Sequence, residues 1–419
     1  MNRFLKALSV AHPWAVTAVL CAVVLSLACA ALDRTFVVHD ADLHLYQTYA
    51  LRVLEGQCPF RDFRVEYPPL ALLPMLLPAL VRTGDFDIYL RLFFLQNILL
   101  LALTTRLVLG LPLFRKGRSG RRRVPAGGYF LLVLISLPHL LLRFDIFPAL
   151  LTLLAVRAVF RDKPVGAGFW LGLGIAAKLY PVVLLAVAGV YYFGSRQYRS
   201  LLRLGGGVGA GLVVSCLPLA VPAGVEIVGF LKYHQVRGLQ IESVWSGLLL
   251  LGQQVGMLRE KIVFNYGAFH LESILSHRLA EGLPVLAVAC FTVLTAWLLY
   301  RFQIEYRRTG RISQEHLGSA LLAVLLLFIT VNKVFSPQYL LWLLPFAGFL
   351  SPVRMVVLVL IFALTTLLFP FTYNALLTLK LPAVLLLNVR NALTVSLLFS
   401  LLNVPQVPSY SRKAEPALK

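Results

Sequence analysis

The sequence predicts an all-α membrane protein with about 12 transmembrane helices, on two observations. Apolar residues make up 59% of the 419 residues and charged residues only 14%, against roughly 45–50% and about 25% in soluble domains. Long apolar segments also follow one another along the chain. A water-soluble fold could not bury this much apolar surface, so the surrounding medium must be lipid. This excludes a cytosolic enzyme, a secreted disulfide-stabilised protein and a disordered chain.

Each predicted span is an apolar segment that can cross a bilayer, alone or as a kinked helix in a bundle. The spans are residues 14–32, 87–112, 124–142, 146–160, 165–178, 181–194, 203–221, 282–300, 316–332, 338–350, 353–369 and 383–402. The first has features of a signal peptide but is long for one, so an uncleaved span is favoured. Segment 68–82 holds four prolines and is expected to be a broken helix at the outer interface, because proline interrupts helices.

Charge predicts how the chain is oriented. The net charge of +21 comes from 39 basic and 18 acidic residues, and six basic residues cluster within 115–123. Basic loops stay in the cytoplasm, which favours both termini inside. A bacterial plasma membrane is the default expectation, and an ER membrane would place the same external loops in the lumen. No basic, aromatic-rich domain lies outside the apolar segments, so nucleic-acid binding is not expected. Residues 1–419 are read as a single domain with two long external loops, 33–86 and 222–281.

Carboxylates gather in the first long loop. Asp40 and Asp42 follow the first span, and Glu66-Tyr67-Pro68-Pro69 comes later in the same loop. A carboxylate beside an apolar wall can serve as a general base, because a less polar setting raises its proton affinity. The alternative is that these are solvated loop acids with a structural role.

Cations are predicted at the outer ends of later spans, on the same side as these carboxylates. Ionisable groups at membrane depth usually line a cavity or pair with each other, although a single lysine can also extend to the lipid headgroups. The candidates for binding a lipid phosphate are Lys333, Arg237, Lys178 and Arg143, and those for orienting substrate are Gln338, Tyr339, His234, Asp145, Glu66 and Tyr67. Cysteine and histidine show no metal-ligand spacing, so neither a metal nor another cofactor is expected.

These motifs resemble those of GT-C glycosyltransferases, and of glycosyltransferase family 87 in particular. Asp42-Leu43-His44-Leu45-Tyr46 is similar to the acidic motif of that family's first external loop, which here also carries Gly56 and Pro59-Phe60. Arg143-Phe144-Asp145, Lys178-Leu179-Tyr180-Pro181 and the segment 333–342 are similar to its later motifs. The resemblance covers about residues 33–350.

The resemblance implies a GT-C-type bundle and an inverting, metal-independent enzyme of the bacterial mannosyl- and arabinosyltransferase kind. Its donor would be a sugar, with mannose the first choice, on a polyprenyl monophosphate. Its acceptor would be a hydroxyl of a lipid or glycan at the outer face. The resemblance assigns the base to Asp42, with Asp40 as the alternative. Two other classes stay open: a secondary transporter or flippase of a lipid-linked or anionic substrate, and a non-catalytic subunit of a cell-envelope complex.

Overall fold

The computed structural model of the protein describes residues 41–81, 84–111 and 126–403. The predicted first span, Asp40 and the basic cluster at 115–123 lie outside the described residues. The described chain is almost entirely helical, with one small sheet.

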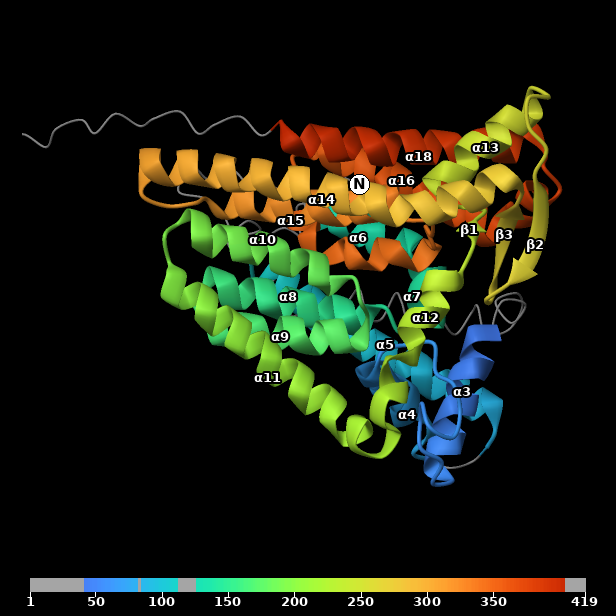
Figure 1. The fold of residues 1–419 in the computed structure, drawn as a ribbon, viewed down its shortest axis with the longest axis horizontal. Helices are drawn as coiled ribbons and strands as arrows, with labels where there is room; N and C mark the ends of the chain where they lie inside the picture. The colour runs from blue at the N-terminus through green and yellow to red at the C-terminus, as the bar shows by residue number, and fades with distance from the viewer. Residues whose placement is uncertain (1–40, 82–83, 112–125, 404–419) are drawn as a thin grey trace, which may run out of the picture.

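Most of the helices lie side by side and run roughly along one axis (Figure 1). In chain order they are α5 (Phe86–Leu109), α6 (Ala126–Ile135), α7 (Leu137–Leu142), α8 (Ile146–Phe160), α9 (Pro164–Ala177), α10 (Pro181–Gly194), α11 (Tyr198–Ala223), α14 (Ile274–Thr309), α15 (Gln314–Val331), α16 (Pro352–Thr366) and α18 (Leu381–Leu402). Many of these helices are joined by short connections, so two helices that are consecutive in the sequence lie antiparallel and next to each other.

Six described helical segments are long and apolar enough to cross a membrane. They are Phe86–Leu109, Tyr198–Val236, Ile274–Thr309, Gln314–Val331, Pro352–Phe371 and Leu381–Leu402. The predicted spans 146–160, 165–178 and 181–194 are the apolar helices α8, α9 and α10, of 14 or 15 residues. At 1.5 Å per residue such helices reach only about 22 Å, short of a bilayer core of about 30 Å. The count of 12 spans therefore remains a prediction.

The predicted span 338–350 is not a continuous α-helix. It forms two 3-10 helices, η5 (Pro337–Trp342) and η6 (Leu344–Phe349). Pro337 and Pro345 stand at the first turns of these helices, and proline cannot donate the backbone hydrogen bond that an α-helix needs at an interior position. Most of this stretch is buried, as is required of irregular backbone at membrane depth.

The described part of the first long loop is folded rather than extended. Helix α3 (Ala41–Leu54) buries Leu43, Tyr46 and Ala50 on one face. This i, i+3, i+7 spacing is the periodicity of an amphipathic helix, so the sequence held a signal that the loop prediction missed. The expected broken helix at 68–82 is instead continuous over Pro69–Ala79: η2 (Pro69–Ala71) runs directly into α4 (Leu72–Ala79), because the backbone stays helical at Ala71 and Leu72. Helix α4 packs on α3 and α5.

The second long loop is also folded, and it adds one small sheet to a chain that is otherwise nearly all-α, as predicted. After η4 (Gly224–Val228) and α12 (Gly229–Val236) come β1 (Leu239–Gln240), α13 (Val244–Gln254), β2 (Lys261–Asn265) and β3 (Ala268–Glu272). The strands form an antiparallel sheet in the order β1-β3-β2. Tyr266 and Gly267 join β2 to β3, both with positive φ, as a two-residue type I′ hairpin requires.

Helices α9 and α11 approach each other closely through glycine. A Cβ atom at Gly168 or Gly172 of α9 would overlap the backbone of α11, and one at Gly207 or Gly211 of α11 would overlap the backbone of α9. Small residues at such a crossing let two helix backbones pack tightly in a membrane. This pair anchors the α8–α11 half of the bundle.

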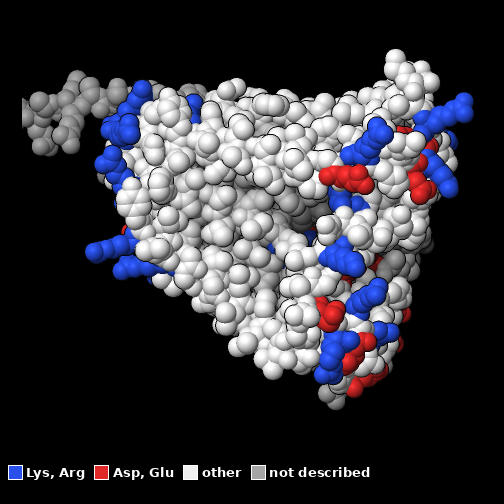
Figure 2. Space-filling model, in the orientation of Figure 1, with Lys and Arg blue, Asp and Glu red and all other residues white. Residues whose placement is uncertain are grey.

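The bundle has two different ends. The α10–α11 and α14–α15 connections lie at one end, and Figure 2 shows Lys and Arg concentrated there. At the other end, which we call the sheet end, lie α3, α4, α12, α13 and the strands, with acidic and basic side chains mixed. The described parts of both long loops therefore lie at one end of the bundle.

Candidate functional site

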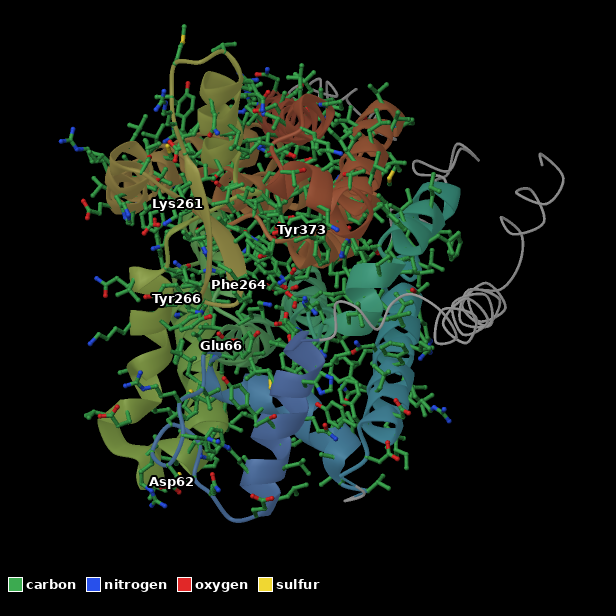
Figure 3. The ribbon with its side chains drawn as sticks, turned by 90° about the vertical axis from the view of Figure 1, so that its right-hand side faces the viewer. Asp62, Glu66, Lys261, Phe264, Tyr266 and Tyr373 are labelled. Carbon is green, nitrogen blue, oxygen red and sulfur yellow. The ribbon has the colours of Figure 1, made fainter. Side chains whose placement is uncertain are left out.

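A cavity of about 350 Å³ opens at the sheet end. Its walls come from α3, the segment after it, the α7–α8 connection, the second long loop and residues 336–377. Its polar lining residues are Asp42, Glu66, Tyr67, Arg143, Tyr233, His234, Arg237, Gln240, Glu242, Tyr266, Ser336, Gln338, Tyr373 and Asn374. Figure 3 views this end and shows Glu66, Phe264, Tyr266 and Tyr373 near its middle, with Asp62 and Lys261 farther out. We call this space the Asp42 cavity.

Asp42 and Arg143 form an ion pair on the wall of this cavity. The Asp42 carboxylate lies 2.8 Å from the Arg143 guanidinium, and the two side chains are 27% and 15% exposed. Asp42 belongs to the first turn of α3, and Arg143 ends α7 in an extended conformation. The side chain of the fully buried Asn97 donates to the Arg143 carbonyl at 3.0 Å. A carboxylate that can reach a substrate is thus held beside a cation on a fixed backbone.

A second ion pair lies deeper and does not line the cavity. Lys178 Nζ is 2.6 Å from Asp145 Oδ1, and Asp145 is fully buried. The same Asp145 oxygen accepts a hydrogen bond from Trp342 Nε1 at 2.7 Å. Trp342 is stacked between Tyr180 and Tyr339, with ring centroids at 4.1 and 3.9 Å. This cluster joins the α7–α8, α9–α10 and η5 segments behind the cavity wall.

Two cations, Arg237 in the second loop and Lys333 after α15, are fixed by neighbouring groups. Arg237 Nε donates to His270 Nε2 at 3.1 Å, and His270 Nδ1 lies 3.1 Å from the Ala268 carbonyl. Burial and the nearby Arg237 lower the pKa of His270 to about 4, so the ring is neutral and accepts from Arg237. Lys333 Nζ donates to the Gln235 carbonyl at 2.8 Å. Burial, with the charge of Arg237, lowers the Lys333 pKa.

Glu242 is a buried carboxyl on the cavity wall. It is 3% exposed and accepts from Gln240 Nε2 at 3.0 Å. Gln240 Oε1 accepts from Phe335 N at 2.9 Å, which connects Glu242 to the 333–342 segment. The buried Arg390 donates to the Glu242 carbonyl at 2.6 Å and lies over the Phe335 ring. Burial raises the pKa of Glu242 to about 7, against the opposing charge of Arg390.

Glu66 is the third carboxyl of the cavity. Burial raises its pKa, and hydrogen bonds from Tyr233 and Tyr67 partly oppose that rise. Glu66 and Glu242 therefore favour the protonated form more than an exposed glutamate does. Pairs of carboxyls in different environments take different acid–base roles, and Asp42 differs from both glutamates in its ion pair with Arg143.

The family of the chain follows from comparison of its sequence with protein-family models. The model of glycosyltransferase family 87 matches residues 66–330, more than half of the chain. The protein belongs to glycosyltransferase family 87. This confirms the resemblance drawn from the motifs, and with it a membrane glycosyltransferase of GT-C type. No curated protein and no solved structure matches the chain.

The structure of this family 87 protein brings seven of the site residues predicted from the sequence to the lining of one cavity. Those that line the Asp42 cavity are Asp42, Glu66, Tyr67, Arg143, His234, Arg237 and Gln338. Asp145, Lys178 and Tyr339 belong to the cluster behind the wall, and Lys333 lies beside the cavity, bonded to Gln235. Their predicted contacts with substrate remain predictions. Among the residues that the structure describes, no three His, Cys, Asp or Glu residues are grouped to hold a metal ion.

Several lining residues were not predicted. Glu242 and Gln240 stand in a polar stretch of the second loop, Gln240-Ile241-Glu242-Ser243, which the sequence places on the same side as Asp42 but whose residues are not among the site candidates. Phe369 and Tyr373 come from a region beyond residue 350 that carries no family motif, yet both line the cavity. The Gln240 and Glu242 side chains are both buried, and buried polar groups need partners, so their place in the site follows from packing that the sequence alone does not reveal. Nothing in the sequence near Tyr373 points to the site.

Proposed function

We propose that the protein is an inverting glycosyltransferase of the bacterial plasma membrane. It would move a sugar, with mannose the first choice, from a polyprenyl monophosphate to a hydroxyl of a lipid or glycan at the outer face. Both termini would be cytoplasmic, with the sheet end outside. The observation that carries the proposal is the Asp42 cavity, where a carboxylate lies in contact with Arg143 and shares one space with Arg237.

In the proposed reaction the Asp42 carboxylate accepts the proton of the acceptor hydroxyl. The acceptor oxygen attacks the anomeric carbon from the face opposite the phosphate and forms the new glycosidic bond. The bond from that carbon to the phosphate oxygen breaks, and the oxygen keeps the electron pair. Cations placed where this negative charge grows stabilise the transition state. Arg143 and Arg237 line the cavity and are the first candidates, followed by Lys333; Asp40 remains the alternative base.

Arg143 has a double role in this scheme. A guanidinium binds phosphate as readily as carboxylate, through the same fork of N–H donors. A donor phosphate that draws Arg143 toward itself would therefore leave the Asp42 carboxylate open to the acceptor hydroxyl.

The test uses purified protein in nanodiscs with radiolabelled polyprenyl-phosphate-mannose, then polyprenyl-phosphate-arabinose, and an envelope lipid extract as acceptor source. We expect label to move into a new product, to the same extent with EDTA present. Transfer from one donor would identify the sugar. Donor that binds but is never transferred would contradict the proposal and favour a transporter or flippase of lipid-linked substrates, or an assembly subunit.

A further inference from the structure

A second cavity, of about 600 Å³, lies next to the Asp42 cavity. One side comes from α3 and the segment after it, and the other from η4, α12 and the hairpin. Its lining residues are Tyr49, Phe60, Arg64, Val65, Glu66, Glu226, Gly229, Phe230, Lys232, Tyr233, Val236 and Tyr266. Its volume lies within the range of about 300–1,000 Å³ that ligand pockets occupy. We call it the α12 cavity.

The two cavities share one wall. Glu66, Tyr233 and Tyr266 line both of them. The Tyr233 side chain hydrogen-bonds to Glu66, and the Tyr233 and Tyr266 rings meet edge to face with centroids 5.4 Å apart. Figure 3 shows Glu66 and Tyr266 close together between α3 and the hairpin. A molecule held in the α12 cavity is therefore separated from the Asp42 cavity by a single layer of side chains.

The lining of the α12 cavity suits a neutral, hydroxyl-rich ring. Its charged residues are of both signs, with Arg64 and Lys232 beside Glu66 and Glu226. Such a mixed set supplies both hydrogen-bond donors and acceptors for hydroxyl groups. Aromatic side chains make up much of the remaining lining, and they provide flat apolar faces for the C–H side of a sugar ring.

The surroundings of the α12 cavity also favour a lipid attached to that ring. Val225, Val228 and Leu231 of η4 and α12 are 83%, 54% and 46% exposed. They belong to the segment Tyr198–Val236, which is long and apolar enough to cross a membrane. An acyl chain that leaves the cavity along this segment would stay in contact with apolar side chains. Its path would therefore not require polar groups to lose their contact with water.

We propose that the α12 cavity binds the carbohydrate head of the acceptor, a glycolipid, and that one acceptor hydroxyl reaches Asp42 past the Glu66–Tyr233 wall. The assignment of this ligand as acceptor rests on the proposed function. Donor and acceptor would then approach the reacting carbon through separate cavities. The donor phosphate belongs in the Asp42 cavity, where Arg143 and Arg237 are, and the neutral sugar belongs in the α12 cavity.

Gly229 offers a substitution that blocks the α12 cavity and spares the fold. It lines the cavity, and a Cβ atom there meets nothing within 4 Å. Gly229→Trp should fill the space. Gly209→Trp is the matched control, because Gly209 lies in the same apolar segment, has no neighbour within 4 Å of a Cβ atom, and does not line the cavity.

The first measurement is steady-state transfer with donor and acceptor varied separately. We expect Gly229→Trp to raise the acceptor KM at least tenfold and to leave the donor KM within twofold, while Gly209→Trp changes neither. An unchanged acceptor KM, an equal effect of Gly209→Trp, or a rise in the donor KM instead would overturn the proposal.

The second measurement does not depend on transfer, so it separates failure of this proposal from failure of the proposed function. Protein in nanodiscs is crosslinked to octyl α-mannoside that carries a diazirine, and the labelled peptides are mapped by mass spectrometry. We expect label on residues 226–236 of wild type and at least a tenfold loss in Gly229→Trp. Label elsewhere, or label unaffected by the substitution, would contradict the site. Competition by methyl α-mannoside as strong as by octyl α-mannoside would assign a soluble glycan rather than a glycolipid.

Discussion

The Asp145–Lys178 pair gives the sharpest prediction about stability. The two charged atoms are 2.6 Å apart, with Asp145 fully buried and Lys178 16% exposed. With an effective dielectric constant of 20, Coulomb's law gives an attraction of about 6 kcal/mol at this distance. Desolvation offsets much of that attraction in the intact pair, but removal of one partner leaves a buried charge uncompensated and costs about 3–5 kcal/mol.

We therefore expect Asp145→Asn and Lys178→Met each to lower the free energy of unfolding by about 3–5 kcal/mol. The double variant should recover about 2 kcal/mol of their sum, because neither charge is then left alone. The assay is reversible unfolding in SDS, followed by far-UV circular dichroism. Asp62→Asn is the control: Asp62 pairs with Arg61 at the surface, where pairs contribute little, and no measurable change is expected. Strictly additive single effects would refute the coupling.

Three further predictions concern pH, the donor and the helix bundle. Burial raises the folded-state pKa of Glu242 from 4.5 to about 7. The free energy of unfolding of the wild type should therefore fall as pH rises from 4.5 to 7, and the total loss at higher pH should be about 3 kcal/mol. Glu242→Gln should have a higher melting temperature than wild type at pH 8 but not at pH 4.5, and an equal difference at both pH values would contradict this. Lys333→Ala should raise the donor KM several-fold without changing acceptor preference in a transfer assay, and an unchanged donor KM would count against a phosphate contact. Gly211→Leu should lower the melting temperature far more than Gly209→Leu, because only Gly211 faces the backbone of α9; equal shifts would contradict close α9–α11 packing.

The membrane class and the family could be predicted because each depends on short-range features of the sequence. Apolar composition requires a lipid-exposed helical protein, whatever the details of packing. Each of the motifs that contain Asp42, Glu66 and Arg143 is a short run of consecutive residues, so each can be recognised without knowledge of the fold. The positive-inside rule predicts that these motifs face one side of the membrane, and in the structure Asp42, Glu66 and Arg143 line the Asp42 cavity.

Other features depend on contacts that hydropathy does not record. Hydropathy does not separate a buried 3-10 segment such as Pro337–Trp342 from a span, because both are apolar. The choice of partners within the site was also open: Asp145 pairs with Lys178, while Arg143 pairs with Asp42. All four of these charged residues lie within a few residues of a helix end, where small changes of backbone direction decide which charges form a pair.

The strands of the second loop were hidden for a different reason. Each is short, and the alternation in Lys261–Asn265 is weak because several of its side chains are exposed. Such segments give little periodic signal of their own. The turn at Tyr266-Gly267 would have been the more informative sign, since glycine favours the left-handed conformation that a tight hairpin needs.

The central claim is that Asp42 is the base of a glycosyl transfer, and Asp42→Asn tests it most directly. Asp87→Asn, which removes the same charge from an exposed position in the first turn of α5, serves as the control. Initial transfer rates are measured at saturating donor, with donor binding measured on the same samples. The account predicts at least a 100-fold loss of rate in Asp42→Asn with donor binding retained, and a wild-type rate in Asp87→Asn. Full transfer activity in Asp42→Asn would contradict it.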